Sequence, residues 1–376
     1  MRDRSHFRPA RRAAAAAALA LVCTAGGAWA QGADDGASCR ASQAPPRARP
    51  SVSLILENDA IQGPDRDYTN GLGVMYSGPL EDCWPLLGLT ARADRLFGRL
   101  VFDFLPGVSE GGEWRPASQV TATLAQQMFT PLDIDRANPD PADRPYAGWL
   151  YGSIGYIGEA ERPASPGSPV TVRLLSVTRL DLGIVGPASG AGALQRFYHR
   201  VMEFDHIPSG WDYQLSNEPG LVVRHERTVA AIRDLGPFQV EASANAGLAL
   251  GNVITDASAG AGLRFGRNVR VDYGPPRFRP GLSGPNTFTA GGGNWAAYVF
   301  VTGGGRAVAR NIFLDGNTFA DSRSVEKRNF VWEYQMGAAI AVSRVKVSAT
   351  RVTRSEEFVG QNRDTVFHSL SLSVRL

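Results

Sequence analysis

The chain has 376 residues, of which 43% are hydrophobic and 42 are glycine, and its formal net charge is +3. Five arginines and one aspartate lie within the first 30 residues, a net +4, so the remainder of the chain carries about −1. This near-neutral remainder argues against nucleic acid as a partner. The five histidines and three cysteines do not have the spacing of a zinc site.

The N-terminus has the three parts of a secretory leader. The arginines precede an apolar run from Ala13 to Cys23, and Ala28-Trp29-Ala30 offers a small-residue cleavage site. We therefore predict a signal peptide over residues 1–30, followed by a periplasmic extension over 31–49. The apolar run is too short for a membrane-spanning helix.

Beyond the leader, hydrophobic residues are spread in alternation with polar ones. Leu370, Leu372 and Val374, for example, alternate with serines up to the C-terminus. A period of two predicts strands with one apolar and one polar face. We predict twelve such strands, near 50–58, 70–78, 118–128, 148–158, 170–184, 220–232, 239–250, 257–266, 295–310, 328–342, 344–350 and 369–376.

Each predicted strand is close to the length that crosses a bilayer at a tilt. Only a closed barrel satisfies the backbone of every strand in a membrane. The fold class we predict is thus all-β, a closed antiparallel transmembrane β-barrel over residues 50–376, with short helical segments in the extracellular loops. A secreted β-sandwich would also alternate, but several of the apolar faces are rich in Ala and Gly, and polar faces carry Arg or Lys in mid-strand. Leu376 stands where such barrels usually end in an aromatic residue.

The connections also carry information about the two ends of the barrel. Since antiparallel strands alternate in direction, the loops after the first, third and fifth strands must emerge at one rim, which faces outside if the N-terminus is periplasmic. Leucines at helical spacing in the 79–118 segment predict a short amphipathic helix at the opposite end. Cys39 and Cys83 remain after leader cleavage, and their spacing leaves a disulfide open.

The first hairpin loop carries candidate metal ligands. Asn58, Asp59 and Thr69 supply amide, carboxylate and hydroxyl oxygens, the donor set of a hard cation such as Ca²⁺. The alternative is a plain hairpin turn, because Asn and Asp favour turns.

Two further residues are candidates for chemistry. His199 lies on a predicted helix from Ala193 to Glu203 and could act as a general base toward water, although a lone histidine is more often a packing or surface residue. Arg136 could hold a phosphate or an oxyanion, or it could simply be solvated.

Several segments, in order, resemble the outer-membrane lipid A 3′-O-deacylase family. The resemblance covers roughly residues 50–376. It rests on the segments 56–59, 67–71, 126–131, 143–150, 183–187, 210–215 and 314–319, together with His199.

The resemblance implies a twelve-stranded barrel that cleaves the 3′-linked acyloxyacyl group of lipid A with Ca²⁺ as cofactor. Lipopolysaccharide would be the substrate, the location would be the bacterial outer membrane, and the active site of the monomer would face the outer leaflet. Asn58, Asp59 and Thr69 match active-site positions and His199 matches the general base, with Ca²⁺ and a cationic side chain stabilising the oxyanion.

Two implied positions depart from this pattern or extend it. Arg136 stands where a characterised member carries a lysine, and Asp205, with Glu203 beside it, is a further candidate metal ligand. A non-enzymatic barrel, porin-like or structural, and a phospholipase-type esterase remain as alternatives. Mn²⁺ or Sr²⁺ could use similar ligands.

Overall fold

The computed structural model describes residues 50–59, 66–79, 115–203, 206–274, 281–282, 287–289 and 295–376. Twelve strands run through them. They are β1 (Ser51–Asn58), β2 (Asp67–Pro79), β3 (Arg115–Thr130), β4 (Ala147–Pro163), β5 (Val170–Val185), β6 (Glu218–Leu235), β7 (Phe238–Gly251), β8 (Ile254–Arg267), β9 (Trp295–Asn311), β10 (Phe330–Val342), β11 (Val345–Arg354) and β12 (Thr365–Arg375).

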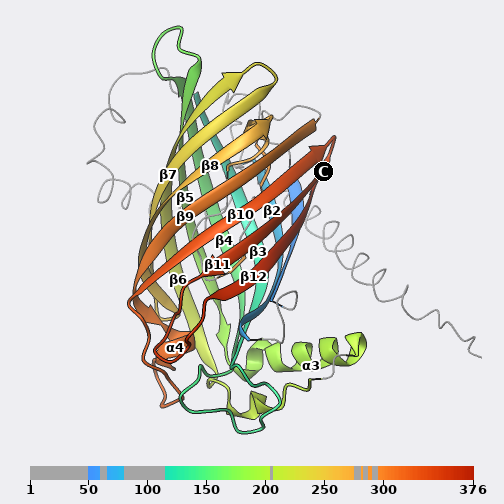
Figure 1. Cartoon of the computed structure of the whole chain (residues 1–376), viewed down its shortest axis with the longest axis vertical. Coiled ribbons are helices and arrows are strands. Elements are labelled where there is room, and N and C mark those ends of the chain that lie inside the picture. The colour runs from blue at the N-terminus through green and yellow to red at the C-terminus, as the bar shows by residue number, and fades with distance from the viewer. Residues whose placement is uncertain are drawn as a thin grey trace, which may run out of the picture. The chain divides into compact units, whose positions relative to one another are not determined.

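The strands form one closed antiparallel barrel (Figure 1). Each strand pairs with its neighbour in sequence, and β1 closes the ring on β12, from Ser51 opposite Arg375 to Asn58 opposite His368. Closure leaves no free sheet edge, as a barrel in a membrane requires. The predicted twelve-stranded barrel is confirmed, and the sandwich interpretation is wrong.

Alternation assigns each strand residue to the wall or to the lumen. On the outer wall of β1 and β12, Leu54, Leu56, Leu370 and Leu372 are exposed. Their neighbours in sequence, serines above all, point inward and are buried. The outer surface is therefore apolar and the interior polar, the arrangement of an outer-membrane barrel.

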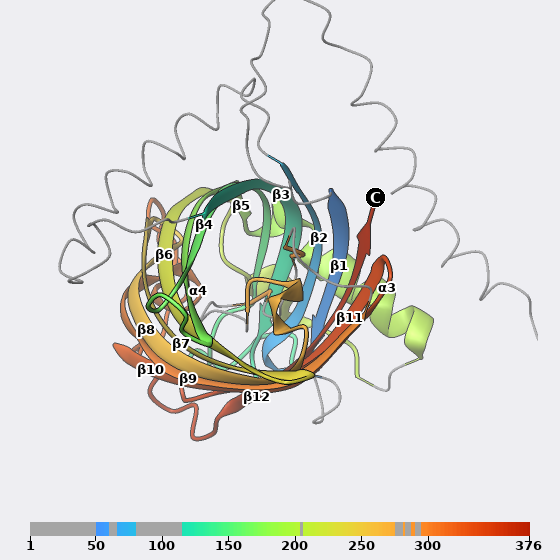
Figure 2. The same ribbon diagram turned by 90° about the horizontal axis from the view of Figure 1, so that it is seen from above.

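The connection between β8 and β9 contributes side chains and backbone to the barrel interior; we call its described residues, 268–274, 281–282 and 287–289, the re-entrant segment. Figure 2, a view down the barrel, shows it inside the ring of strands. Near its start, Asp272 lies 2.6 Å from Arg264 and 3.1 Å from Lys346, two buried side chains of the lumen. Further along, the backbone N–H of Leu282 donates to Glu57 of β1, and the carbonyl of Phe288 accepts from Gln119 of β3. The lumen is thus occupied by the chain itself.

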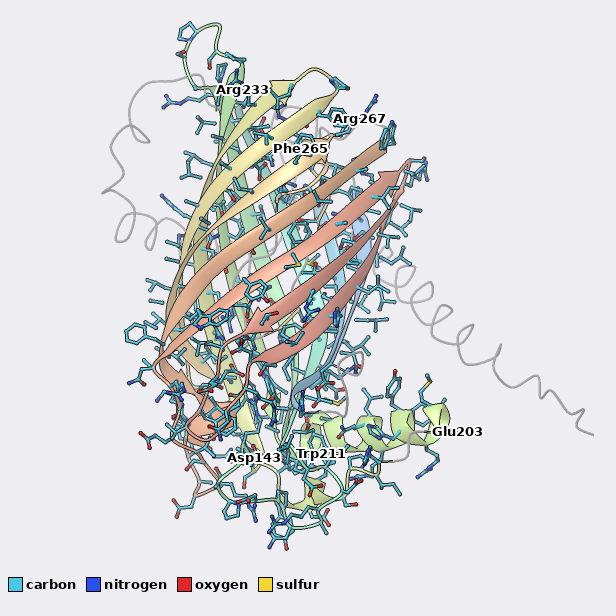
Figure 3. All side chains as sticks on the ribbon, viewed as in Figure 1. Asp143, Glu203, Trp211, Arg233, Phe265 and Arg267 are labelled. Carbon is cyan, nitrogen blue, oxygen red and sulfur yellow. The ribbon has the colours of Figure 1, made fainter. Side chains whose placement is uncertain are left out.

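The two ends of the barrel differ. We call the end with α3 (Ala191–Met202) and α4 (Ile312–Asp315) the loop end, and the other the terminal end, because β1 starts and β12 stops there (Figure 1). The connections after β1, β3 and β5 all emerge at the loop end, as predicted. The predicted helix over 193–203 is confirmed with small shifts at both ends. In Figure 3, Asp143, Trp211 and Glu203 lie at the loop end, and Arg233, Phe265 and Arg267 at the terminal end.

Some predictions concern residues outside the described ranges. These are the signal peptide over 1–30, the extension over 31–49, the pair Cys39 and Cys83, and nearly all of the 79–118 segment. Within the described part of the chain, no helix combines the length and apolarity needed to cross a membrane.

Candidate active site

Asn58, Asp59 and Thr69 meet at the loop end of the first hairpin. The Nδ2 of Asn58 donates to the backbone carbonyl of Thr69 over 3.1 Å, and the backbone N–H of Asp59 is 3.4 Å from the same oxygen. Asp59 accepts from the backbone N–H of Arg66 at 2.7 Å and is buried. The structure therefore brings these three predicted residues together.

A β-bulge sets the direction of Thr69. The register of β2 on β3 shifts between Tyr68 and Asn70, so Thr69 is the extra residue. Its hydroxyl lies 2.6 Å from that of Thr130 in β3. Because Leu54 and Leu56 point outward, alternation places Asn58 on the outer wall as well.

Helix α3 packs against this same outer wall and then extends away from the barrel (Figures 1 and 2). Its first residue, Ala191, is buried with Met128, Ile134, Tyr146 and Trp211. A Cβ on Gly148 would lie only 2.3 Å from that of Ala191, so glycine is what lets the helix approach β4 so closely. The Nε1 of Trp211 donates to Gln195 on the helix at 2.7 Å. The motif 210–215 thus holds α3 in place.

His199 lies on the buried face of α3 with only 6% of its surface exposed. Its Nδ1 is 2.7 Å from the backbone carbonyl of His206. A carbonyl oxygen can only accept, so Nδ1 carries the proton and Nε2 of the neutral ring holds the lone pair. Nε2 is therefore the nitrogen that can take up a proton.

Asp135, in the loop between β3 and β4, holds the segment that orients His199. One carboxylate oxygen accepts from His206 Nδ1, and the other accepts from the backbone N–H of Ile207 at 2.8 Å. The bond from His206 contributes most to holding the pKa of Asp135 below its ordinary value, assisted by that of Ile207 and by the nearby imidazole of His199. The carboxylate thus stays charged and keeps the His206 carbonyl in position.

Behind the hairpin, on the lumen side, a buried pair supports Asn58 and Thr69. The hydroxyl of Tyr68 and the backbone N–H of Leu282 both donate to the same oxygen of Glu57, each over 2.6 Å. A Cβ on Gly281 would lie 2.2 Å from the Tyr68 hydroxyl. The re-entrant segment therefore contacts the residues that directly precede Asn58 and Thr69 in sequence.

The donor set at the hairpin fits a hard cation better than a transition metal. It offers amide, carboxylate and hydroxyl oxygens, and Asn58 engages Thr69 through its nitrogen rather than its oxygen. Among the described residues, no group of three or more His, Cys, Asp or Glu side chains could hold a metal ion. A cation here would therefore depend on neutral oxygens beside the single carboxylate of Asp59.

Arg136 and Asp205 do not join this group in the described structure. Arg136 lies 3.7 Å from Asp140 in its own loop, and both side chains are more than half exposed. Asp205 lies outside the described residues, and its neighbour Glu203 is the exposed C-terminal cap of α3.

Several residues near the site were not singled out from the sequence. Gln126 and Thr130 face the outer wall beside α3, and Gln126 donates to the backbone carbonyl of Ser189 just before the helix. His368 is opposite Asn58 across the β1–β12 pair. The parity of the predicted strand at 118–128 could have indicated Gln126, whereas Thr130 and His368 lie just beyond the predicted strands. The contact of Asp135 with His206 depends on how two loops meet, which no local pattern reveals.

The motif at 314–319 connects loops. Asn317 donates to Glu218 at 3.1 Å and to the carbonyl of Ser216 at 3.0 Å, and the N–H of Thr318 donates to Glu218 at 2.7 Å. It joins the connection after β9 to the one after β5 and so steadies the loop end that carries α3.

A closed twelve-stranded barrel with an apolar outer wall and a filled lumen defines an outer-membrane β-barrel protein. The profile of the family described as outer membrane protein LpxR matches residues 15–376, and the chain belongs to this family.

One solved structure agrees on the fold. LpxR from Salmonella typhimurium is 20% identical, with a TM-score of 0.67 and coverage of 87% of this chain and 100% of that chain. The β domain of the Bordetella autotransporter BrkA is 11% identical with a TM-score of 0.40, covering 88% of this chain and 100% of that one. A search of curated proteins found no match.

Proposed function

We propose that this protein is an outer-membrane esterase that hydrolyses the 3′-linked acyloxyacyl group of lipid A, with Ca²⁺ as cofactor and its active site facing the outer leaflet. Membership of the LpxR family and the resemblance of its motifs to lipid A 3′-O-deacylases support this reaction and substrate.

One observation carries the proposal. Asn58 and Thr69 place polar atoms on the outer wall, where a barrel in a membrane otherwise presents apolar side chains, and α3 covers the adjacent strand with a buried histidine. Polar groups are rare on the lipid-facing wall of a barrel and mark functional positions there. This position therefore suits a lipid whose polar ester groups lie beside Asn58 and Thr69.

In the proposed mechanism, His199 acts as general base. Its Nδ1–H donates to the His206 carbonyl, which fixes the ring and leaves Nε2 to take the proton of a water molecule that attacks the ester carbonyl. Asn58, Asp59 and Thr69 would hold Ca²⁺. When bound, the ion would stabilise the negative charge that develops on the carbonyl oxygen. Asp135 keeps the base aligned through His206.

The two alternatives differ in what the barrel must contain. A porin needs an aqueous path, whereas here Asp272 of the re-entrant segment forms ion pairs with Arg264 and Lys346 inside the lumen. This favours the esterase over a porin-like barrel. A phospholipase would use the same groups on a different lipid, so only the substrate distinguishes it.

The test is mass spectrometry of lipid A incubated with the purified full-length barrel in detergent, with Ca²⁺ or with chelator. We expect the mass of the acyloxyacyl group to be lost with Ca²⁺ only. Unchanged lipid A from a folded barrel would contradict the proposal, and cleavage of phospholipid alone would point to the phospholipase. Cleavage that persists with chelator would retain the reaction but refute the metal.

A further inference from the structure

Two basic side chains lie on the outer wall next to Asn58. Register places Asn58 of β1 opposite His368 of β12, and His368 opposite Arg351 of β11. In β12 the outward residues that follow are Leu370, Leu372 and Val374, and in β11 those that precede Arg351 include Val345 and Val347, all exposed. By the same alternation, His368 and Arg351 point outward toward lipid.

Among the described residues, neither of these two side chains has a counter-ion. Arg351 is exposed and forms no ion pair or hydrogen bond with a described residue, and Nδ1 of His368 is buried without a hydrogen-bond partner in the described structure. Two lumen-facing cations of β11 contrast with this: Lys346 pairs with Asp272, and Arg354 pairs with Glu333 at 2.7 Å. In the described structure, the two lumen-facing cations of β11 are therefore neutralised by carboxylates, whereas Arg351 on the lipid side is not.

The neighbouring strand indicates the depth of Arg351. It is opposite Met336 of β10. Trp332, which is exposed, lies four residues before Met336 and so nearer the loop end. Aromatic side chains mark the membrane interface in such barrels. Arg351 therefore lies on the membrane side of that aromatic level, three residues from the loop-end terminus of β11.

We propose that Arg351 and His368 form an anion-binding site on the outer wall that holds a phosphate group of the lipid substrate. This inference rests on the proposed function and specifies how the substrate would be oriented: with its phosphate on β11 and β12, the lipid's polar region lies beside Asn58. A guanidinium presents parallel N–H donors to phosphate oxygens, and the bond strengthens where water is scarce.

The test compares two substrates and three matched substitutions. Wild type, Arg351→Gln, His368→Gln and Arg267→Gln are assayed as full-length barrels on phosphorylated lipid A and on lipid A with its phosphates removed. Arg267 is the control, because it is exposed on the outer wall of β8 at the terminal end (Figure 3). Binding of both lipids is also measured without Ca²⁺, independently of cleavage.

For Arg351→Gln we expect KM and Kd for phosphorylated lipid A to rise about tenfold, as loss of one charged hydrogen bond implies. The values for the dephosphorylated lipid should not change, and Arg267→Gln should behave as wild type. His368→Gln should show the same selectivity with a smaller change. Equal effects of Arg351→Gln on both lipids, or equal effects of Arg267→Gln, would overturn the proposal. If wild type cleaves neither lipid but binds the phosphorylated one through Arg351, the esterase function fails while the anion site stands.

Discussion

Polar residues occur on both faces of the barrel, but they are accommodated differently. In the lumen they pair with one another: Glu357 lies 3.5 Å from Arg144 and 3.7 Å from both Arg306 and Arg354. On the outer wall, Asn58 donates to a backbone carbonyl, Thr69 bonds the hydroxyl of Thr130, and Arg351 has no counter-ion among the described residues. The charged residues of the lumen therefore have a structural role, since they stabilise the fold. The polar residues on the outer wall form no such network in the described structure, so we look for function there.

The strongest way to test this contrast is to remove the base. His199→Ala should lower the rate of acyl release by roughly 10²–10⁴-fold, the usual contribution of a general base, with little change in thermal unfolding. Mass spectrometry of lipid A over time measures it. His225→Ala is the matched control. His225 is also buried, but its Nδ1 lies 2.9 Å from the hydroxyl of Thr178 on the neighbouring strand β5. An equal loss of acyl-release rate in both variants would show that His199 contributes no more than another buried histidine.

The lumen should show the opposite result. Glu357→Gln leaves three buried arginines without their shared carboxylate and should cost about 3–5 kcal/mol of unfolding free energy. Thermal unfolding in detergent measures it. Activity well below the unfolding temperature should remain, and a loss of activity in a fully folded variant would contradict this.

The same carboxylate gives a pH dependence. Burial alone would raise the pKa of Glu357, but Arg354, Arg144 and Arg306 outweigh it and hold the pKa below its ordinary value. A depressed pKa stabilises the fold at pH values above the ordinary Glu pKa, and this stability is lost as pH falls through the folded-state value. The unfolding temperature of wild type should therefore drop on acidification more than that of Glu357→Gln. Parallel curves would show that Glu357 does not titrate.

Asp135 lies in the loop between β3 and β4, and we expect it to affect the outer-wall site through its bond with His206. Asp135→Asn cannot accept from both His206 and Ile207, so His199 should lose alignment and kcat should fall about tenfold with KM unchanged. Asp140→Asn, an exposed carboxylate of the same loop paired with Arg136, should change neither constant. A rise in KM alone would show that Asp135 acts on lipid binding instead.

The smallest effects should come from a pair of buried tyrosines in the lumen. Tyr68→Phe removes the bond to Glu57, which also binds Leu282 of the re-entrant segment. Tyr298→Phe removes the bond to Asp272, near the start of that segment. Each should cost about 1 kcal/mol of stability. Only Tyr68→Phe should also slow acyl release, because Tyr68 directly precedes Thr69. Equal rates for the two variants would show that the lumen does not influence the wall.

The fold was largely predictable because alternation is a local signal. All twelve predicted strands exist, and the helix that carries His199 begins only two residues earlier than predicted. The same alternation is enough to put Asn58 on one face with Leu54 and Leu56.

What escaped prediction depends on contacts distant in sequence or on single-residue irregularities. The bulge at Thr69 changes the face of one residue without a pattern in the sequence. The bond between Asp135 and His206 needs two loops to meet. The path of the re-entrant segment to Glu57 depends on a lumen that exists only once the barrel has closed.

The pairing of the first strand with the last determines when the site comes into existence. Asn58 meets His368 only after the whole chain has been synthesised and β12 has closed on β1. Contacts between the two ends of a chain form late in folding, because closing so large a loop carries an entropic cost. A nascent or half-inserted chain therefore lacks the juxtaposition of Asn58 and His368, which only closure of the barrel creates.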